Sequence, residues 1–167
     1  MHGTVFVPAK PPAFAAAVWV DGAGRKTRNI GLAQLFAKRG IALLTYDKGG
    51  VGASGGVYAG PEAGTNNVSR ENLALAEDAA TAIRALRQER KLSNVPRGFI
   101  GGSQAGWIIP AAALKYREAR FIVNGRRRLT GYAANRRRTI TKRKLTVFRV
   151  GSSTCAVSSW SRLDAAC

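Results

Sequence analysis

Ser103 is the residue whose surroundings most clearly indicate chemistry. It lies in the segment Gly98-Phe-Ile-Gly-Gly-Ser-Gln-Ala-Gly-Trp107, where two apolar residues suited to a buried strand are followed by small residues and then by the apolar run 107–114. This pattern predicts a strand, a sharp turn with the serine at its apex, and a packed helix. A turn of this kind exposes a serine hydroxyl at the end of a sheet, where it can act as a nucleophile.

A nucleophilic serine needs a base, usually a histidine that a carboxylate orients. The chain contains one histidine, His2. It precedes the first predicted strand, and we interpret it as a bystander. Downstream of Ser103 the acidic residues are Glu118 and Asp164. The sequence therefore predicts an exposed serine without a credible histidine or acid partner.

Strands and helices alternate along the elements that must position Ser103. Thr27 or Asn29 is the predicted cap of a helix that Gly40 ends, and a second helix ends before Asn94 and Pro96. A third helix follows the turn and runs to about residue 118. Alternation of this kind predicts an α/β protein, a mostly parallel sheet with flanking helices. The predicted strands are 4–7, 15–20, 41–46, 98–101 and 120–123.

The second helix has the clearest sequence signals. Ser69 is its predicted N-cap, and Val68 and Leu73 are expected to form a hydrophobic staple. The helix stripe predicted to face the core consists of Leu73, Ala76, Ala80 and Ile83.

Trp19 and Trp107 are expected to be core residues rather than substrate contacts.

Three segments, in the right order, carry a resemblance to a known family. Val18-Trp-Val-Asp-Gly-Ala-Gly24 resembles a strand followed by a His-Gly-x-Gly loop. Leu44-Thr-Tyr-Asp-Lys-Gly-Gly-Val-Gly-Ala-Ser-Gly55 resembles the signature Tyr-Asp-x-Arg-Gly-x-Gly-x-Ser, and Gly101-Gly-Ser-Gln-Ala-Gly106 resembles the Gly-x-Ser-x-Gly elbow. Residues 3–124 are therefore similar to the N-terminal half of an α/β-hydrolase, close to the serine aminopeptidase and dienelactone hydrolase-like branches.

The resemblance implies roles for named residues. Ser103 would be the nucleophile, and the backbone amides of Ala23 and Gln104 would form the oxyanion hole. The family supplies its acid and then its histidine after the serine, so the chain is expected to be an ester or peptide hydrolase that is inactive or severely impaired. No cofactor and no metal is implied. The matching signature positions are Asp21, Gly22, Gly24, Tyr46, Asp47, Gly50, Gly52 and Ser54.

The sequence departs from the family pattern at three positions. Asp21 stands in place of the usual histidine. It either puts negative charge where the oxyanion develops, or it pairs with Arg25 or Lys26. Gly49 stands in place of a frequent arginine and removes a structural ion pair. Ala105 replaces the last glycine of the elbow, a mild change if the helix can approach the strand with a methyl group between them.

The glycines of residues 49–56 raise one further alternative. Gly50-Val-Gly-Ala-Ser-Gly55 loosely matches a dinucleotide-binding fingerprint. A long loop follows it rather than an immediate helix, and no Gly-Lys-Ser/Thr motif is present. The pattern therefore disfavours a nucleotide site.

Basic charge is concentrated in the last quarter of the chain. The net charge is +18 over 167 residues, but residues 125–167 carry 11 Lys/Arg against 1 acid, whereas residues 1–124 carry 16 against 8. We divide the chain into a truncated α/β-hydrolase portion, 1–124, and a basic, low-pattern tail, 125–167. The tail is interpreted as out-of-frame translation or a fused unrelated segment. The strand at 120–123 would then be an unpaired edge, which favours an edge-strand oligomer.

The alternative function gives the tail a partner. Its basic clusters would contact nucleic acid or another anionic surface without catalysis. The cluster residues are Arg126, Arg127, Arg128, Arg136, Arg137, Arg138, Lys142, Arg143 and Lys144.

The start of the chain lacks a signal-peptide layout and no apolar run could span a bilayer. These features favour a cytoplasmic protein with Cys155 and Cys167 as free thiols.

Overall fold

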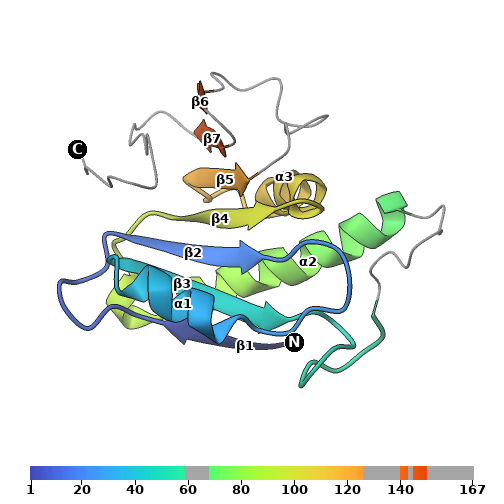
Figure 1. The fold of residues 1–167 in the computed structure, drawn as a ribbon, viewed down its shortest axis with the longest axis horizontal. Coiled ribbons are helices and arrows are strands. Elements are labelled where there is room, and N and C mark those ends of the chain that lie inside the picture. Colours follow the sequence, from blue (N-terminus) through green and yellow to red (C-terminus); the bar gives the residue numbers. More distant parts are fainter. Residues whose placement is uncertain (59–67, 126–139, 143–144, 150–167) are drawn as a thin grey trace.

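The computed structural model describes residues 1–58, 68–125, 140–142 and 145–149, and within them seven strands form one sheet (Figure 1). The strand order across the sheet is β1-β3-β2-β4-β5-β7-β6. The strands are β1 (His2–Phe6), β2 (Ala15–Val20), β3 (Ile41–Asp47), β4 (Arg97–Gly102), β5 (Phe121–Gly125), β6 (Ile140–Lys142) and β7 (Leu145–Arg149).

The centre of the sheet is parallel. β2 pairs in parallel with both β3 and β4, and β4 pairs in parallel with β5. β1 is antiparallel to β3 at one edge, with His2 opposite Asp47. All seven residues of β3 are buried, as expected for a strand covered on both faces. The predicted α/β class and its mostly parallel sheet are confirmed.

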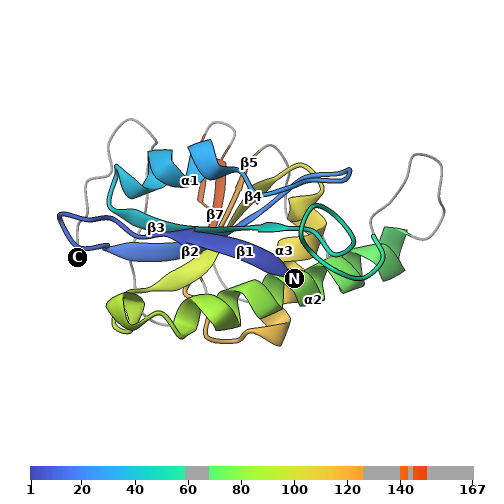
Figure 2. The same cartoon turned by 90° about the horizontal axis from the view of Figure 1, so that it is seen from below.

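Helices cover both faces of this sheet (Figure 2). α1 (Ile30–Ala37) lies on one face, where Ala33 and Phe36 pack on β3 residues. α2 (Val68–Arg87) and α3 (Ala105–Lys115) lie on the other face and share the larger apolar core. A short 3-10 helix, η1 (Arg90–Leu92), leads into β4. In the described part of the chain, none of the helices combines the length and apolarity needed to cross a bilayer.

Local signals predicted the helix boundaries unequally well. The Asn29 side chain caps α1 by accepting a hydrogen bond from the Leu32 amide at 3.0 Å, which confirms one of the two predicted caps. Ser69 is not an N-cap, because α2 already begins at Val68. Ala76, Ala80 and Ile83 are buried as predicted, but Leu73 is 55% exposed and lies outside the core. Leu75 is buried in the core instead, so the buried face of α2 is rotated relative to the predicted stripe.

The prediction that the strand at 120–123 forms an unpaired edge of the sheet is wrong. β5 is paired along its whole length with β7, from Phe121 opposite Arg149 to Gly125 opposite Leu145. β7 in turn pairs antiparallel with β6. The unpaired edge expected at residues 120–123 therefore does not exist, because two strands from the basic tail extend the sheet there. Arg126, Arg127, Arg128, Arg136, Arg137, Arg138, Arg143, Lys144, Cys155, Asp164 and Cys167 lie outside the described residues.

Candidate active site

Ser103 occupies a sharp turn between β4 and α3. Its φ of 59° is the one positive value for a non-glycine residue in the described ranges. Such backbone conformations cost about 1–3 kcal/mol and persist where surrounding structure imposes them. Here the Ser103 amide donates to the Gly125 carbonyl at 3.4 Å, and the Ser103 carbonyl accepts from the Gly106 amide at 3.0 Å. The side chain is exposed at the carboxyl end of β4.

Close packing behind the turn explains its small residues. A Cβ on Gly101 would lie 2.5 Å from the Val20 carbonyl oxygen and 2.6 Å from the Ala105 Cβ. Gly101 therefore cannot carry a side chain without moving backbone. Ala105 is fully buried at the start of α3, and its methyl group fits because Gly101 leaves that space empty. The alanine in place of the last elbow glycine is thus accommodated by this packing.

The loop after β2 lies directly against the serine. A Cβ on Gly22 would come within 3.3 Å of the Ser103 Cβ and 3.7 Å of its Oγ. The two amides predicted to form an oxyanion hole, those of Ala23 and Gln104, donate no hydrogen bond to any of the residues that the structure describes. The sheet thus brings together the predicted nucleophile and the two segments that carry the predicted donors.

Asp21 has a partner that neither sequence interpretation anticipated. Its Oδ1 accepts a hydrogen bond from the Trp19 indole Nε1 at 2.9 Å. Burial raises the pKa of the Asp21 carboxyl, and the Trp19 hydrogen bond and the charges of Lys48 and Lys26 act in the opposite direction. Arg25 does not pair with Asp21, because its guanidinium donates to the Gly50 carbonyl at 2.8 Å.

Lys48 is the residue beside this loop that sequence reasoning missed. It directly follows β3, is only 2% exposed, and donates from Nζ to the Gly22 carbonyl at 2.5 Å and the Gly24 carbonyl at 3.1 Å. Burial lowers the pKa of its ammonium to about 8, although the charge of Asp21 opposes this shift. A lysine two residues after the apolar run 41–46 is the sequence signal that could have indicated a buried cation.

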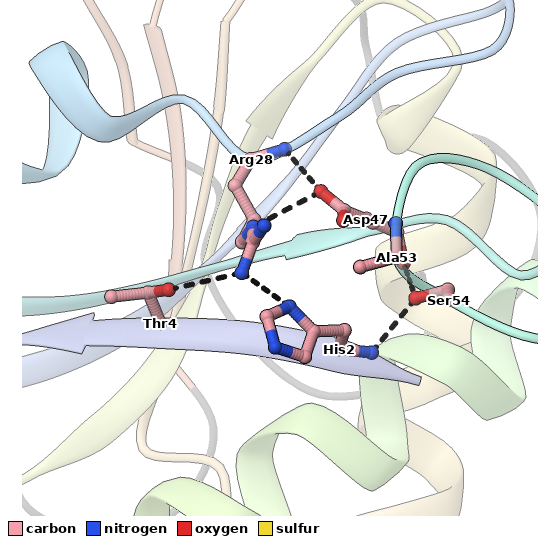
Figure 3. Close-up of polar contacts among 6 residues, drawn as sticks. All are labelled: His2, Thr4, Arg28, Asp47, Ala53 and Ser54. Atoms are coloured by element: carbon pink, nitrogen blue, oxygen red, sulfur yellow. Dashed lines mark hydrogen bonds and ion pairs between the residues drawn. The ribbon is translucent and has the colours of Figure 1, made fainter.

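The residues of the second signature form a separate network around Asp47, beside Arg28 (Figure 3). The buried Asp47 carboxylate accepts from the Arg28 amide at 2.8 Å and the Ala53 amide at 2.9 Å, and it pairs with the Arg28 Nε at 3.2 Å. Burial acts to raise the pKa of Asp47, but the two amide hydrogen bonds and the Arg28 charge hold it below its usual value. Ser54 donates to the Asp47 carbonyl at 2.6 Å. This network holds the loop after β3 in place.

The remaining signature positions have structural roles. Gly52 has a φ of +58°, and a Cβ there would lie 2.6 Å from the Asp47 Oδ2. Gly50 likewise has a φ of +69° and no room for a Cβ. Tyr46 is buried in β3, where desolvation and the Asp78 charge raise the pKa of its phenol. The amides of Gly50, Val51, Ala53 and Ser54 all donate to acceptors in the chain, so they form no open phosphate cradle.

Neither His2 nor Glu118 lies near the serine. His2 is on β1, three strand positions from β4, which corresponds to about 14 Å across the sheet. Its ring Nδ1 contacts the Arg28 guanidinium and its amide donates to Ser54 (Figure 3). Glu118 lies between α3 and β5, at the opposite end of the sheet from Ser103, and pairs with Arg87 at 3.0 Å. His2 therefore belongs to the network around Arg28 rather than to the turn that carries Ser103.

Beside the turn, the structure corrects the expectation for Trp107 and adds a side-chain contact for Gln104. Trp107, expected in the core, is 43% exposed on the first turn of α3. Gln104 donates from Nε2 to the Asn72 Oδ1 of α2 at 3.1 Å, while its buried Oε1 has no hydrogen-bond partner in the described residues. α2 thus fixes the Gln104 side chain beside the serine.

Gly49, which stands where the family often has arginine, lies next to a carboxylate of α2. The Gly49 amide donates to Oδ2 of Asp78 on α2 at 3.1 Å. A Cβ on Gly49 would lie 3.3 Å from that same oxygen. The carboxylate that an arginine at position 49 would meet is therefore present in this chain.

No protein-family model matches the chain, and no curated protein matches it. Among solved structures it is similar to a thermostable carboxyl esterase from Bacillus coagulans, with 16% identity and a TM-score of 0.52 over 72% of this chain and 37% of that one. It is also similar to TT1662 from Thermus thermophilus, with 21% identity and a TM-score of 0.51 over 72% of this chain and 50% of the other.

A third structure extends the same likeness. Acetyl xylan esterase 1 from Thermoanaerobacterium sp. shares 18% identity and a TM-score of 0.50, over 71% of this chain and 41% of its own. The chain spans half or less of the length of these three proteins. Identities at this level show the fold alone. With its strand order, its flanking helices and these structural neighbours, the described part of the chain is a partial α/β-hydrolase fold.

Proposed function

We propose that Ser103 is the nucleophile of a serine-hydrolase site for ester or peptide bonds, and that the amides of Ala23 and Gln104 stabilise the oxyanion. The observation that carries the proposal is the backbone of Ser103, whose φ of 59° holds an exposed hydroxyl against Gly22. A strained non-glycine residue at a strand–helix turn is typical of functional positions. Two amides without acceptors in the described structure lie in the segments that flank it.

The chemistry of this site is acyl transfer at a low rate. Ser103 Oγ forms a bond to the ester carbonyl carbon, the bond to the leaving oxygen breaks, and water later hydrolyses the acyl-serine. Within these 167 residues no histidine accepts the hydroxyl proton, because His2 lies about 14 Å away across three strand positions. The proton therefore passes to solvent, which slows turnover most for peptide bonds and for esters with poor leaving groups. Oxyanion donors and binding alone retain about 10³–10⁴-fold catalysis over water in enzymes that have lost a triad member.

Covalent labelling tests the proposal. A fluorophosphonate forms an Oγ–phosphorus bond and expels fluoride, and peptide mass mapping then identifies the modified residue. We expect slow labelling of Ser103 and none in Ser103→Ala. Ser93→Ala is the matched control, since Ser93 is an exposed serine next to η1 at the far end of the sheet. Labelling that persists in Ser103→Ala would place the reactive group elsewhere.

A second proposal concerns the basic tail. Residues 125–167 carry 11 Lys/Arg against 1 acid, and we propose that this segment contacts polyanions without sequence preference. Neutralising about five phosphates gives a slope of about −4 to −5 for log K against log salt. Titration of a fluorescent duplex DNA at several salt concentrations measures that slope. Sharp discrimination between DNA sequences at physiological salt would contradict this proposal.

A further inference from the structure

Lys48 is a buried cation for which the serine chemistry proposed above has no role. Its side chain reaches from the end of β3 under the loop after β2, where Nζ donates to the carbonyls of Gly22 at 2.5 Å and Gly24 at 3.1 Å. Its backbone amide donates to the Lys26 carbonyl at 3.2 Å. Lys48 therefore fixes the loop after β2 at three carbonyl groups.

One of these carbonyls belongs to the peptide that carries a predicted oxyanion donor. The Gly22 carbonyl and the Ala23 amide share a planar trans peptide unit, so the two groups point in opposite directions. Because the carbonyl is held on the Lys48 ammonium, the Ala23 N–H is directed away from it. Gly22 itself packs against Ser103, with a Cβ position 3.3 Å from the Ser103 Cβ.

The loop needs such an anchor. Gly22 and Gly24 flank Ala23 and populate a wide range of φ and ψ, with Gly24 at a φ of +91°. Oxyanion donors act only when they are held within about 0.5 Å of the productive geometry. We propose that Lys48 is the positioning residue that orients the Gly22–Ala23 peptide, so that the Ala23 amide serves as an oxyanion donor to the Ser103 site. This inference rests on the proposed function.

The charges around Lys48 fit a buried ammonium. Asp21 in the same loop and Asp78 on α2 act to keep it protonated, and Lys26 acts against protonation. The Tyr58 ring lies 5.9 Å from Nζ, within reach of a cation–π contact. Burial of the ammonium opposes these favourable terms and brings the pKa of Lys48 to about 8. The ammonium therefore titrates in a range where its effect on the loop can be followed in the native protein.

The kinetic test compares variants of the full chain. Lys48→Met removes both side-chain contacts to carbonyls while keeping a side chain of similar length. Lys48→Arg restores the donors and the charge, and Lys91→Met removes an exposed cation from η1, far from the loop after β2. We expect Lys48→Met to lower the second-order rate constant for fluorophosphonate labelling of Ser103 about tenfold, less than the 10²–10³ of a lost oxyanion donor. Lys48→Arg should recover most of that loss, and Lys91→Met should stay within about twofold, because Lys91 is an exposed cation outside the contact network. Equal rates in Lys48→Met and the unmodified chain would overturn the proposal.

A second measurement does not depend on any reaction at Ser103. We expect the amide resonances of Ala23 and Arg25 to titrate with the Lys48 ammonium, at a midpoint near 8. Each of these amides shares a peptide unit with a carbonyl, that of Gly22 or Gly24, that accepts a hydrogen bond from Lys48 Nζ. The same resonances should not titrate there in Lys48→Arg. Absence of any Lys48-dependent titration of these amides, up to the pH at which the chain unfolds, would overturn the inference even if Ser103 is labelled. Failure to label Ser103, with the titration present, would instead contradict the proposed function.

Discussion

The loop after β3 and the turn after β4 both lie at the carboxyl ends of the parallel strands, yet they use their polar groups differently. Asp47 is buried and accepts from two amides and a guanidinium, so its charge is fully engaged in holding the loop together. Ser103 is exposed, strained, and flanked by amides without acceptors in the described residues. A carboxylate in the first environment contributes stability, whereas a hydroxyl in the second is available to a ligand.

The largest expected effect on stability comes from removing the Asp47 carboxylate. Asp47→Ala leaves Arg28 without its ion-pair partner and two amides without acceptors. We expect the free energy of unfolding to fall by about 3 kcal/mol, in the range for a broken buried pair. Denaturant unfolding followed by circular dichroism measures it. Glu77→Ala is the control, since its pairs with Arg84 and Lys115 are half-exposed and should contribute less than about 1 kcal/mol. Equal losses in the two variants would remove the distinction between the two regions.

The packing behind the serine is the next test. Gly101→Ala brings a methyl group to 2.5 Å from the Val20 carbonyl oxygen, which backbone rigidity does not allow. We expect a loss of about 2 kcal/mol in the free energy of unfolding, as for an overpacked core. Gly55→Ala should be near neutral, because no atom lies within 4 Å of its Cβ position. A thermal melt of both variants would reveal whether the turn is imposed by this contact.

Relief of strain at the serine should give a smaller, stabilising effect. Ser103→Gly removes the penalty for a positive φ and should raise the free energy of unfolding by about 1 kcal/mol. The same change at Ser93, whose φ of −57° is helical, should lower it by about 0.5–1 kcal/mol. Opposite signs in urea titrations are expected. If Ser103→Gly is destabilising, the turn stores no strain.

The smallest effect concerns the absent arginine. Gly49→Arg places a cation beside the Asp78 carboxylate, which already accepts from the Gly49 amide. We expect a gain of about 0.5 kcal/mol in the free energy of unfolding, typical of a partly exposed pair. Gly49→Met is the control for added side-chain volume without charge. A gain shared by both variants in thermal melts would attribute the effect to packing rather than to the ion pair.

Much of the fold could be predicted because its signals are local. The continuous apolar run of β3, the Asn29 cap of α1 and the small residues around Ser103 each specify their own element. Patterns that depend on neighbours were less informative. Trp107 follows the turn in an apolar run but is exposed, because nothing in the described residues covers the first turn of α3 on that side.

The sequence alone determined the alternation of strands and helices, the position of the exposed serine and the lack of a histidine after it. Tertiary structure decided which distant residues meet. It brought Gly22 against Ser103, buried Lys48 beneath the same loop, and placed His2 three strands away. It also paired β7 with β5. The physical reason is that backbone conformation and turn chemistry act over a few residues, whereas strand order and burial depend on the packing of the whole sheet.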